Sequence, residues 1–352
     1  MEKQPVNGVL EDFRIEFLEC WHRMPNKGFF LILLAAWLAL FHFLGNVTLG
    51  YIHTPSLLSW MHSAYLPTHD AGATDDSHGR LIPFVVLALF WWKRKELMAL
   101  PLKLWAPGLG LVGLALVMHL VGYMGQQPRI SIVALFVGIY GLMGVAWGRE
   151  WLHASFFPFV MFAFCIPLGW SGVSLTFPLR VLVVRIVEFI CHNLLAIDIV
   201  VQGTAIMDPS GRYQYEVAAA CSGMRSLIAT LAIAVIYAMM SFRTWWKRGL
   251  LLASALPLAV FGNVVRMLTI VIAAEIGGQE WGARIHEGGP GGIYSLLPYI
   301  PAFAGLLFLG HVLAEPPQPS APLSSTSAAG EPGPADEPDP PTRGDAQPAR
   351  PA

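Results

Sequence analysis

The sequence predicts an all-α integral membrane protein with about eight transmembrane helices. Hydrophobic residues make up 55% of the 352 residues and charged residues only 13%, a balance foreign to ordinary soluble domains. Several apolar runs reach the length of about 20 residues that a helix needs to span a bilayer. Before the sixth span, the pattern predicts an extracytoplasmic amphipathic helix followed by a short β-hairpin.

Composition also excludes several classes of protein. The formal net charge is −1, and the chain has neither a basic run nor a Gly-rich phosphate motif, so no nucleic-acid partner is expected. The four cysteines, Cys20, Cys165, Cys191 and Cys221, show no CxxC spacing. Neither a disulfide framework nor a zinc site is therefore indicated, and we expect no metal or cofactor.

The N-terminal half begins with residues 1–28, which we interpret as a polar cytoplasmic segment. The first apolar run has a long mixed-charge leader and lacks a small-residue cleavage site, so it is expected to remain as a span rather than act as a signal peptide. The predicted spans one to five are 29–49, 81–92 (beginning near Ser77), 105–124, 130–148 and 152–170.

Residues 171–217 interrupt this pattern. From Phe177 to Ile197, the polar residues Arg185, Glu188 and His192 share one helical stripe, so this helix is expected to lie in the membrane interface. Turn residues at 208–211 then predict a hairpin. Its arms would be Val200–Met207 and Arg212–Val217.

The remaining spans are predicted at 222–241, 250–276 and 293–313, with a Gly-rich loop over 277–292. The residues from 29 to 313 would form one transmembrane domain. After it, residues 314–352 are rich in Pro and Ala and are expected to be a disordered cytoplasmic tail.

Basic residues predict the orientation. Lys and Arg gather in the N-terminal segment, in 93–103, at Arg149 and in 243–248, and these parts alternate with loops poor in both. The positive-inside rule therefore places them in the cytoplasm. Cys221 and His286 then share the outer face of the membrane.

Cys221 and Arg266 are each candidate functional residues because of their predicted positions in membrane helices. Cys221 would lie in the first turn of the sixth span, where free N–H groups and the helix dipole favour a thiolate, although a lone Cys is commonly a small buried hydrophobe. Arg266 lies inside the seventh span, and a buried cation there demands a partner. It could simply snorkel, or pair with Glu275 or Glu188.

Together, Cys221, Arg266 and His286 could perform acyl transfer. The Cys221 thiolate would attack a peptide carbonyl and form a thioester. Arg266 could hold the thiolate or the oxyanion, and His286 could move the proton of the leaving and incoming groups. Sequence places no Asp or Asn clearly to orient His286.

Four further residues are secondary candidates for substrate binding. Arg225 lies one turn after Cys221, and Asn263 lies on the face of Arg266. His78 follows Asp75 and Asp76, whose spacing fits no metal-ligand pattern well. Glu216 begins the stretch that leads to the thiol.

Four pieces of sequence in this order resemble the exosortase/archaeosortase family of multi-pass membrane cysteine transpeptidases. They are DDSHGRLIPF at 75–84, EVAAACSGMRSL at 216–227, NVVRM at 263–267 and EWGARIHE at 280–287. The resemblance covers about residues 29–313 and implies a catalytic triad of Cys221, Arg266 and His286. One departure is the Gly-rich run HEGGPGG that begins at His286.

The resemblance also implies a function. Substrates would be exported proteins with a C-terminal sorting signal made of a short motif, a transmembrane helix and a basic cluster. The enzyme would cut at the motif and transfer the new carboxyl end to a cell-surface polysaccharide or lipid acceptor. It would lie in the bacterial inner membrane, with cytoplasmic termini and a periplasmic active site. The alternatives are a component for export of lipid-linked polysaccharide and a plain membrane cysteine protease.

Overall fold

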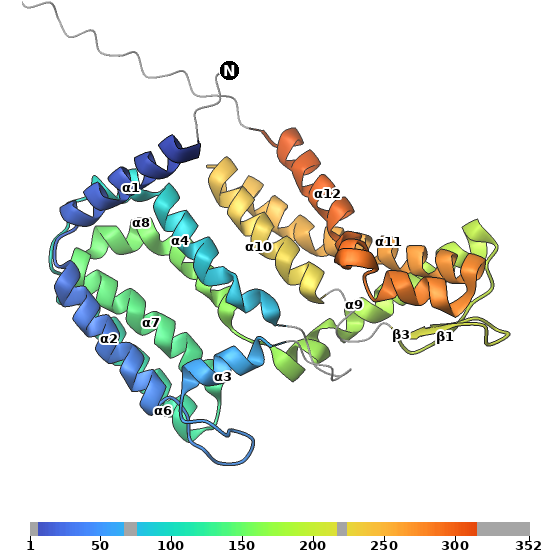
Figure 1. Cartoon of the computed structure of the whole chain (residues 1–352), viewed down its shortest axis with the longest axis horizontal. Helices are drawn as coiled ribbons and strands as arrows, with labels where there is room; N and C mark the ends of the chain where they lie inside the picture. The colour runs from blue at the N-terminus through green and yellow to red at the C-terminus, as the bar shows by residue number, and fades with distance from the viewer. Residues whose placement is uncertain (1–5, 67–75, 217–223, 315–352) are drawn as a thin grey trace, which may run out of the picture. The chain divides into compact units, whose positions relative to one another are not determined.

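A computed structural model describes residues 6–66, 76–216 and 224–314 (Figure 1). The N-terminal part is almost entirely helical. Its elements are α1 (Val6–Arg23), α2 (Lys27–Phe43), α3 (Leu57–Ala64), the 3₁₀ turn η1 (Ser77–Arg80), α4 (Ile82–Trp92), α5 (Arg94–Met98), α6 (Gly108–Met124), α7 (Pro128–Trp147), α8 (Arg149–Val160) and the 3₁₀ turn η2 (Met161–Cys165).

The C-terminal part adds more helices and a small sheet. Its elements are α9 (Gly169–Ile190), the π-helical turn η3 (Cys191–Leu195), β1 (Val200–Gln202), β2 (Ala205–Met207), β3 (Gln214–Glu216), α10 (Met224–Ser241), α11 (Trp245–His286), the 3₁₀ helix η5 (Pro290–Leu296) and α12 (Tyr299–Val312). Figure 1 shows α10, α11 and α12 beside one another, with α9 and the sheet near the far end of α11.

Close helix packing in the N-terminal part depends on small residues. The side chain of Trp37 in α2 is buried against α7, where its indole N–H donates to the carbonyl of Leu135 at 3.0 Å. A Cβ at Gly138 would lie only 2.0 Å from the Trp37 ring. The absence of a side chain at Gly138 therefore lets α2 pack directly on α7.

A glycine also allows close packing between α11 and α12. A Cβ at Gly262 would lie 2.1 Å from the backbone oxygen of Pro298, the residue just before α12. Buried side chains of α10, α11 and α12, including Ala238, Leu251 and Leu306, complete this contact. α11 is thereby fixed along the middle of its length.

The end of α11 differs from the predicted loop over 277–292. The backbone kinks at Gly278, with φ 71° and ψ −170°, and then continues as helix to His286. That second piece is amphipathic, because Gly282 is buried and Ile285 packs against the core formed by α9, α11 and the sheet. Burial of one face explains why this Gly-containing stretch is helical, whereas Gly288 and Gly289 just after it have positive φ and end the helix.

The predicted hairpin is a three-stranded antiparallel sheet in the order β1-β2-β3. The arm expected over Val200–Met207 is wrong as a single strand, because Gly203 adopts φ 61° and turns the chain back on itself. Pairing then runs Val201 to Ile206 and Ile206 to Tyr215. The turn expected over 208–211 is present, closed by the Gly211 N–H donating to the Asp208 oxygen at 2.9 Å.

The expected interfacial helix begins earlier than predicted, at Gly169, and its regular α-helical part ends at Ile190. Val184 and Val187 are fully buried in the core formed with α11, and Arg185 and Glu188 form an ion pair of 2.9 Å beside this buried stripe. The position of this helix in the membrane interface stays a prediction.

The single span predicted over 152–170 is wrong, because the chain breaks within this range. α8 ends at Val160, η2 ends at Cys165, and Ile166 is extended with ψ 112°. The cause is local, because the residue before a proline is driven out of the helical region and Ile166 precedes Pro167. A new helix can begin only after this point.

The predicted spans overlap described helices, with the fifth of them broken, but a count of eight is not confirmed. By length and composition, three described helices suit a membrane span: Pro128–Trp147, Trp245–His286 and Gly292–Val312. A fourth is added if Glu11–Arg23 and Lys27–Phe43, bent by 91°, count as one. The protein is therefore a largely helical membrane protein with three to four candidate spans and a small sheet.

Candidate active site

Arg266 and His286 meet, although 20 residues separate them on α11. A guanidinium N–H of Arg266 (Nη2) donates to the backbone oxygen of His286 at 3.1 Å. In a straight helix the two residues would be about 30 Å apart, at about 1.5 Å per residue. The kink at Gly278 brings the end of the helix back toward Arg266, and both side chains are half-buried.

The His286 imidazole has an unused ring nitrogen. Its Nε2 is buried and has no hydrogen-bond partner among the described residues. The ring lies beside Tyr215 of β3, with centroids 6.0 Å apart and an interplanar angle of 31°. Leaving a buried polar atom unpaired costs about 1–3 kcal/mol, so this nitrogen is available for a substrate or a neighbouring group.

The two carboxylates that the sequence offered as partners of Arg266 are bound elsewhere. Glu275 accepts from Arg212 at 2.8 Å and from the hydroxyl of Tyr213 at 3.3 Å. Glu188 accepts from Arg185. Arg266 therefore forms an ion pair with neither Glu275 nor Glu188 among the described residues.

β3 is attached to the helical piece that carries His286. The Tyr215 hydroxyl donates to the backbone oxygen of Gln279 at 2.7 Å. The side-chain oxygen of Gln279 accepts from the backbone N–H of Gln214 at 3.0 Å, and its NH₂ group donates to the Gln214 oxygen at 3.4 Å. A Cβ at Gly282 would lie 2.2 Å from the Tyr215 hydroxyl, so strand and helix are in direct contact.

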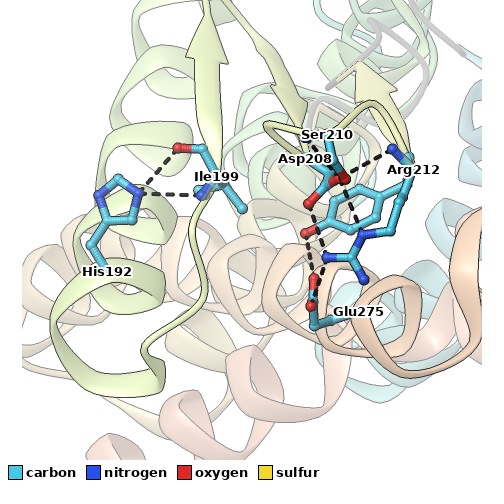
Figure 2. A network of polar contacts seen from close by, with 7 residues as sticks. His192, Ile199, Asp208, Ser210, Arg212 and Glu275 are labelled. Carbon is cyan, nitrogen blue, oxygen red and sulfur yellow. Dashed lines mark hydrogen bonds and ion pairs between the residues drawn. The ribbon is translucent and has the colours of Figure 1, made fainter.

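A polar network also fixes the turn before β3 (Figure 2). Asp208 accepts from the Ser210 N–H at 3.0 Å and the Ser210 hydroxyl, and it pairs with the Arg212 guanidinium at 3.0 Å. The same guanidinium reaches Glu275 on α11 at 2.8 Å. Hydrogen bonds from Arg212 and then Ser210 hold the pKa of the Asp208 carboxyl well below its usual range.

His192 holds the other end of the sheet. Figure 2 shows its ring against Ile199, just before β1. The Nε2 atom lies 3.1 Å from the backbone oxygen and 3.3 Å from the backbone nitrogen of Ile199. The sheet is therefore tied to η3 at its start and to α11 at its end.

Cys221 lies in 217–223, outside the described residues. The described chain stops at Glu216, the last residue of β3, and resumes at Met224, where α10 begins. Glu216 and Arg225 are placed by their backbone alone, in β3 and in the first turn of α10. The elements on either side of the thiol are thus fixed, and one of them abuts His286.

A family model described as transmembrane exosortase (Exosortase_EpsH) matches residues 70–310. This match covers well over half of the chain and includes Cys221, Arg266 and His286. The chain belongs to the transmembrane exosortase family. No curated protein and no solved structure matches this exosortase.

Asn263 and His78 of the exosortase have different surroundings. Asn263 is buried one turn before Arg266 on α11. His78 lies in η1, next to Ser77 and two residues after the buried Asp76. Within the described ranges, no hydrogen bond joins His78 to Arg266 or His286, so its role in binding stays a prediction.

Four residues that shape the surroundings of Arg266 and His286 are not marked by the sequence pattern: Gly278, Gln279, Tyr215 and Arg212. The Gly-Gly pair at 277–278 predicts a loop, but the same pair is also compatible with the kink that the structure has inside α11. Nothing local marks Gln279 or Tyr215, because their partners are more than 60 residues away in the chain.

Proposed function

We propose that this exosortase is a membrane-embedded cysteine protease and transpeptidase. It cleaves the C-terminal sorting signal of exported proteins through a Cys221 thioester and transfers them to a cell-surface acceptor. Family membership supports a sorting transpeptidase in general. The observation that carries the specific proposal is the contact between Arg266 and the backbone of His286, which gathers a cation and an imidazole at the end of β3.

The proposed reaction has two steps, formation of the thioester and its attack by the acceptor. The Cys221 sulfur attacks the carbonyl carbon of the scissile peptide, the C–N bond breaks, and protonated His286 gives its proton to the leaving amine. The neutral imidazole then takes a proton from the acceptor nucleophile, which attacks the thioester and releases the thiolate. Arg266 stabilises negative charge, first on sulfur and then on the carbonyl oxygen.

Chain geometry supports bringing the thiol to this site. Cys221 is five residues beyond Glu216, a span of at most about 17 Å in extended chain. Tyr215, one residue earlier, already packs beside the His286 ring. A sulfur within that reach can approach both the free imidazole nitrogen and the guanidinium.

The membrane arrangement belongs to the same proposal. Eight spans, with the N-terminus and the Lys/Arg-rich loops in the cytoplasm, put Cys221, Arg266 and His286 on the periplasmic side of a bacterial inner membrane. Exported proteins reach that side as they leave the translocation machinery. Arg225, Asn263, His78 and Glu216 are proposed as residues that contact substrate.

The test is cleavage of a sorting-signal substrate in cells that carry single variants. Cys221→Ala, Arg266→Ala and His286→Ala are each expected to accumulate uncut substrate, with Arg284→Ala, an exposed arginine of α11, as the control. A cut product whose new carboxyl end carries a covalent modification establishes transfer. A product with a free carboxyl end would instead indicate a plain protease. Polysaccharide export that is kept in Cys221→Ala and lost in Arg266→Ala, with the sorting-signal substrate left uncut in wild type, would indicate a transporter.

A further inference from the structure

Glu275 lies on α11 one turn before the kink at Gly278, and its carboxylate is bound to the segment that leads into β3. One oxygen, Oε1, accepts from the Arg212 guanidinium at 2.8 Å (Figure 2). The other, Oε2, accepts from the hydroxyl of Tyr213 at 3.3 Å, and Tyr213 is only 2% exposed. The two residues just before β3 are therefore bound to the part of α11 that precedes the kink.

The next two residues along the chain are bound to the part of α11 that follows the kink. Gln214 exchanges hydrogen bonds with the side chain of Gln279, and the Tyr215 hydroxyl donates to the Gln279 backbone oxygen at 2.7 Å. Segment 212–215 therefore crosses the kink and contacts both sides of Gly278. Glycine itself restricts the backbone little, so contacts that cross the kink are needed to fix the direction of the second helical piece.

The Arg212 guanidinium is already held in place by a second carboxylate. Its Nε donates to one oxygen of Asp208 at 3.2 Å and its Nη2 to the other at 3.0 Å, and the Asp208 side chain is only 4% exposed. An exposed ion pair is ordinarily weak, because two long side chains lose their freedom when it forms. Asp208 has already restricted Arg212, so the pair with the half-buried Glu275 resists opening more than a typical surface pair does.

We propose that Glu275 is a positioning residue for the transpeptidase reaction. By binding Arg212 and Tyr213, it holds the strand across the kink and so fixes where the second piece of α11 places His286 relative to Arg266. This role rests on the proposed function, in which Arg266 and His286 act together. Among the described residues, Glu275 forms no hydrogen bond with either of them, so it acts through the geometry of α11.

Kinetics of the full-length enzyme in detergent test this role. The probe is a carrier protein fused to a C-terminal segment that has a short motif, a transmembrane helix and a basic cluster. Glu275→Ala is expected to lower kcat about tenfold with little change in KM, as the loss of one charge-assisted hydrogen bond that aligns the site predicts. Glu275→Gln keeps an acceptor for Arg212 and should restore part of the rate.

Glu188 on α9 offers a matched control. Its side chain is 27% exposed, against 32% for Glu275, and it pairs with Arg185 at 2.9 Å, against 2.8 Å for Glu275 with Arg212. The pair of Glu188 is local to one helix and does not cross the kink. Glu188→Ala should therefore keep the wild-type kcat, although it removes a carboxylate of similar burial from a similar ion pair.

Spin labels on the two pieces of α11 measure the kink without any reaction. The labels are attached at Phe261→Cys and Arg284→Cys, both of which are exposed positions on either side of Gly278. Cys20→Ser and Cys221→Ala remove two native thiols, and the other two cysteines are buried. A straight helix would hold the labelled positions about 35 Å apart, at about 1.5 Å per residue.

The labelled protein and its Glu188→Ala variant are expected to give one narrow distance distribution, centred below that of a straight helix. In Glu275→Ala the distribution should broaden and extend to longer distances, because the second piece of α11 is no longer held from the first. Glu275→Gln should lie between the two. Agreement between the order of the distances and the order of kcat supports a positioning role.

Two results would overturn the proposal. One is an equal kcat in wild type and Glu275→Ala, and the other is a loss of kcat without a change in the distances, because Glu275 would then act in another way. A wild type that leaves the probe uncut overturns the proposed function instead. The distances are measured without Cys221 and still show whether Glu275 holds the kink, so the two proposals fail separately.

Discussion

Arg266 donates to the backbone oxygen of His286, so its guanidinium holds the site together besides carrying charge. A guanidinium has five N–H donors in a fixed plane and can serve His286 and a second acceptor at once. A lysine ammonium at the same place keeps the charge, but it is a single point on a flexible stem. A substitution of Arg266 by lysine therefore separates the effect of the positive charge from the effect of the guanidinium's hydrogen-bond geometry.

Arg266→Lys tests this difference. We expect cleavage to fall about 100-fold, the magnitude found when one donor to a developing oxyanion is removed. The measurement is the initial rate of substrate cleavage in membranes. Arg284→Lys, on the same helix in an exposed pair with Glu280, should keep the wild-type rate. A full rate for Arg266→Lys would mean that charge alone suffices.

Asp208 gives a prediction that depends on pH. Its folded-state pKa is depressed, because Arg212 and Ser210 donate to the carboxylate. Its contribution to stability is therefore present above the unfolded-state pKa of about 3.9, and is lost as pH falls through the lower folded-state value. We expect hydrogen-exchange protection of residues 208–216, corrected for intrinsic rates, to hold down to about pH 4 and then decline.

Asp208→Asn is the matched control for that decline. The amide cannot ionise, so protection of the turn should be weaker at neutral pH and should lack the acid step. If wild type and Asp208→Asn decline together, another group controls the acid sensitivity of the sheet.

Among the elements, α11 brings Arg266 and His286 of the proposed site together because it is not a straight helix. Gly278 has φ 71° and ψ −170°, a region of backbone space essentially reserved for glycine. Open space surrounds the position where its Cβ would lie. Any cost of a side chain there is thus conformational rather than steric.

Gly278→Ala is expected to destabilise the end of α11 by about 1–3 kcal/mol and to reduce cleavage. The measurements are local hydrogen exchange over 279–286 and the cleavage rate. Gly249, also on α11 and also in open space, has helical geometry, so Gly249→Ala should be neutral or stabilising by up to about 1 kcal/mol. Equal effects of the two substitutions would show that the kink is not needed.

The contact between β3 and α11 involves two glutamines that contribute differently to it. Gln279 uses its side chain to bond the backbone of Gln214, whereas Gln214 contributes only backbone groups. Gln279→Ala should therefore slow cleavage about three- to tenfold, as expected for about 0.5–1.5 kcal/mol of lost hydrogen bonding. Gln214→Ala should leave the rate unchanged, and a similar loss in both would point to a different role for this strand.

At the scale of the whole molecule, the sequence anticipated a mostly helical membrane protein with a small sheet before α10, but not the helices α1 and α3. It did not anticipate the break before Pro167 or the division of Val200–Met207 into two strands, since one proline and one glycine outweigh the apolar pattern there. It pointed to Arg266 and His286 as partners, and the structure has a hydrogen bond between them. The supporting contacts of Tyr215 and Arg212 could not be foreseen, because they join residues more than 60 positions apart.

The proposed orientation leads to an accessibility experiment. Gln202→Cys, in the sheet, should react with a membrane-impermeant maleimide applied outside, whereas Lys95→Cys, in α5, should react only after the membrane is opened. Labelling is measured as the mass gained over the parent chain. Reaction of both residues from the same side would contradict the eight-span arrangement.

The attachment of Gln279 to Gln214 has one more implication, for how a partner chain approaches. The outward-facing N–H and C=O groups of an edge strand can form hydrogen bonds with another extended peptide that docks alongside. Here a side-chain amide already occupies both groups at Gln214. An incoming polypeptide therefore cannot lengthen the sheet at this residue, and must be recognised through side chains or at another edge.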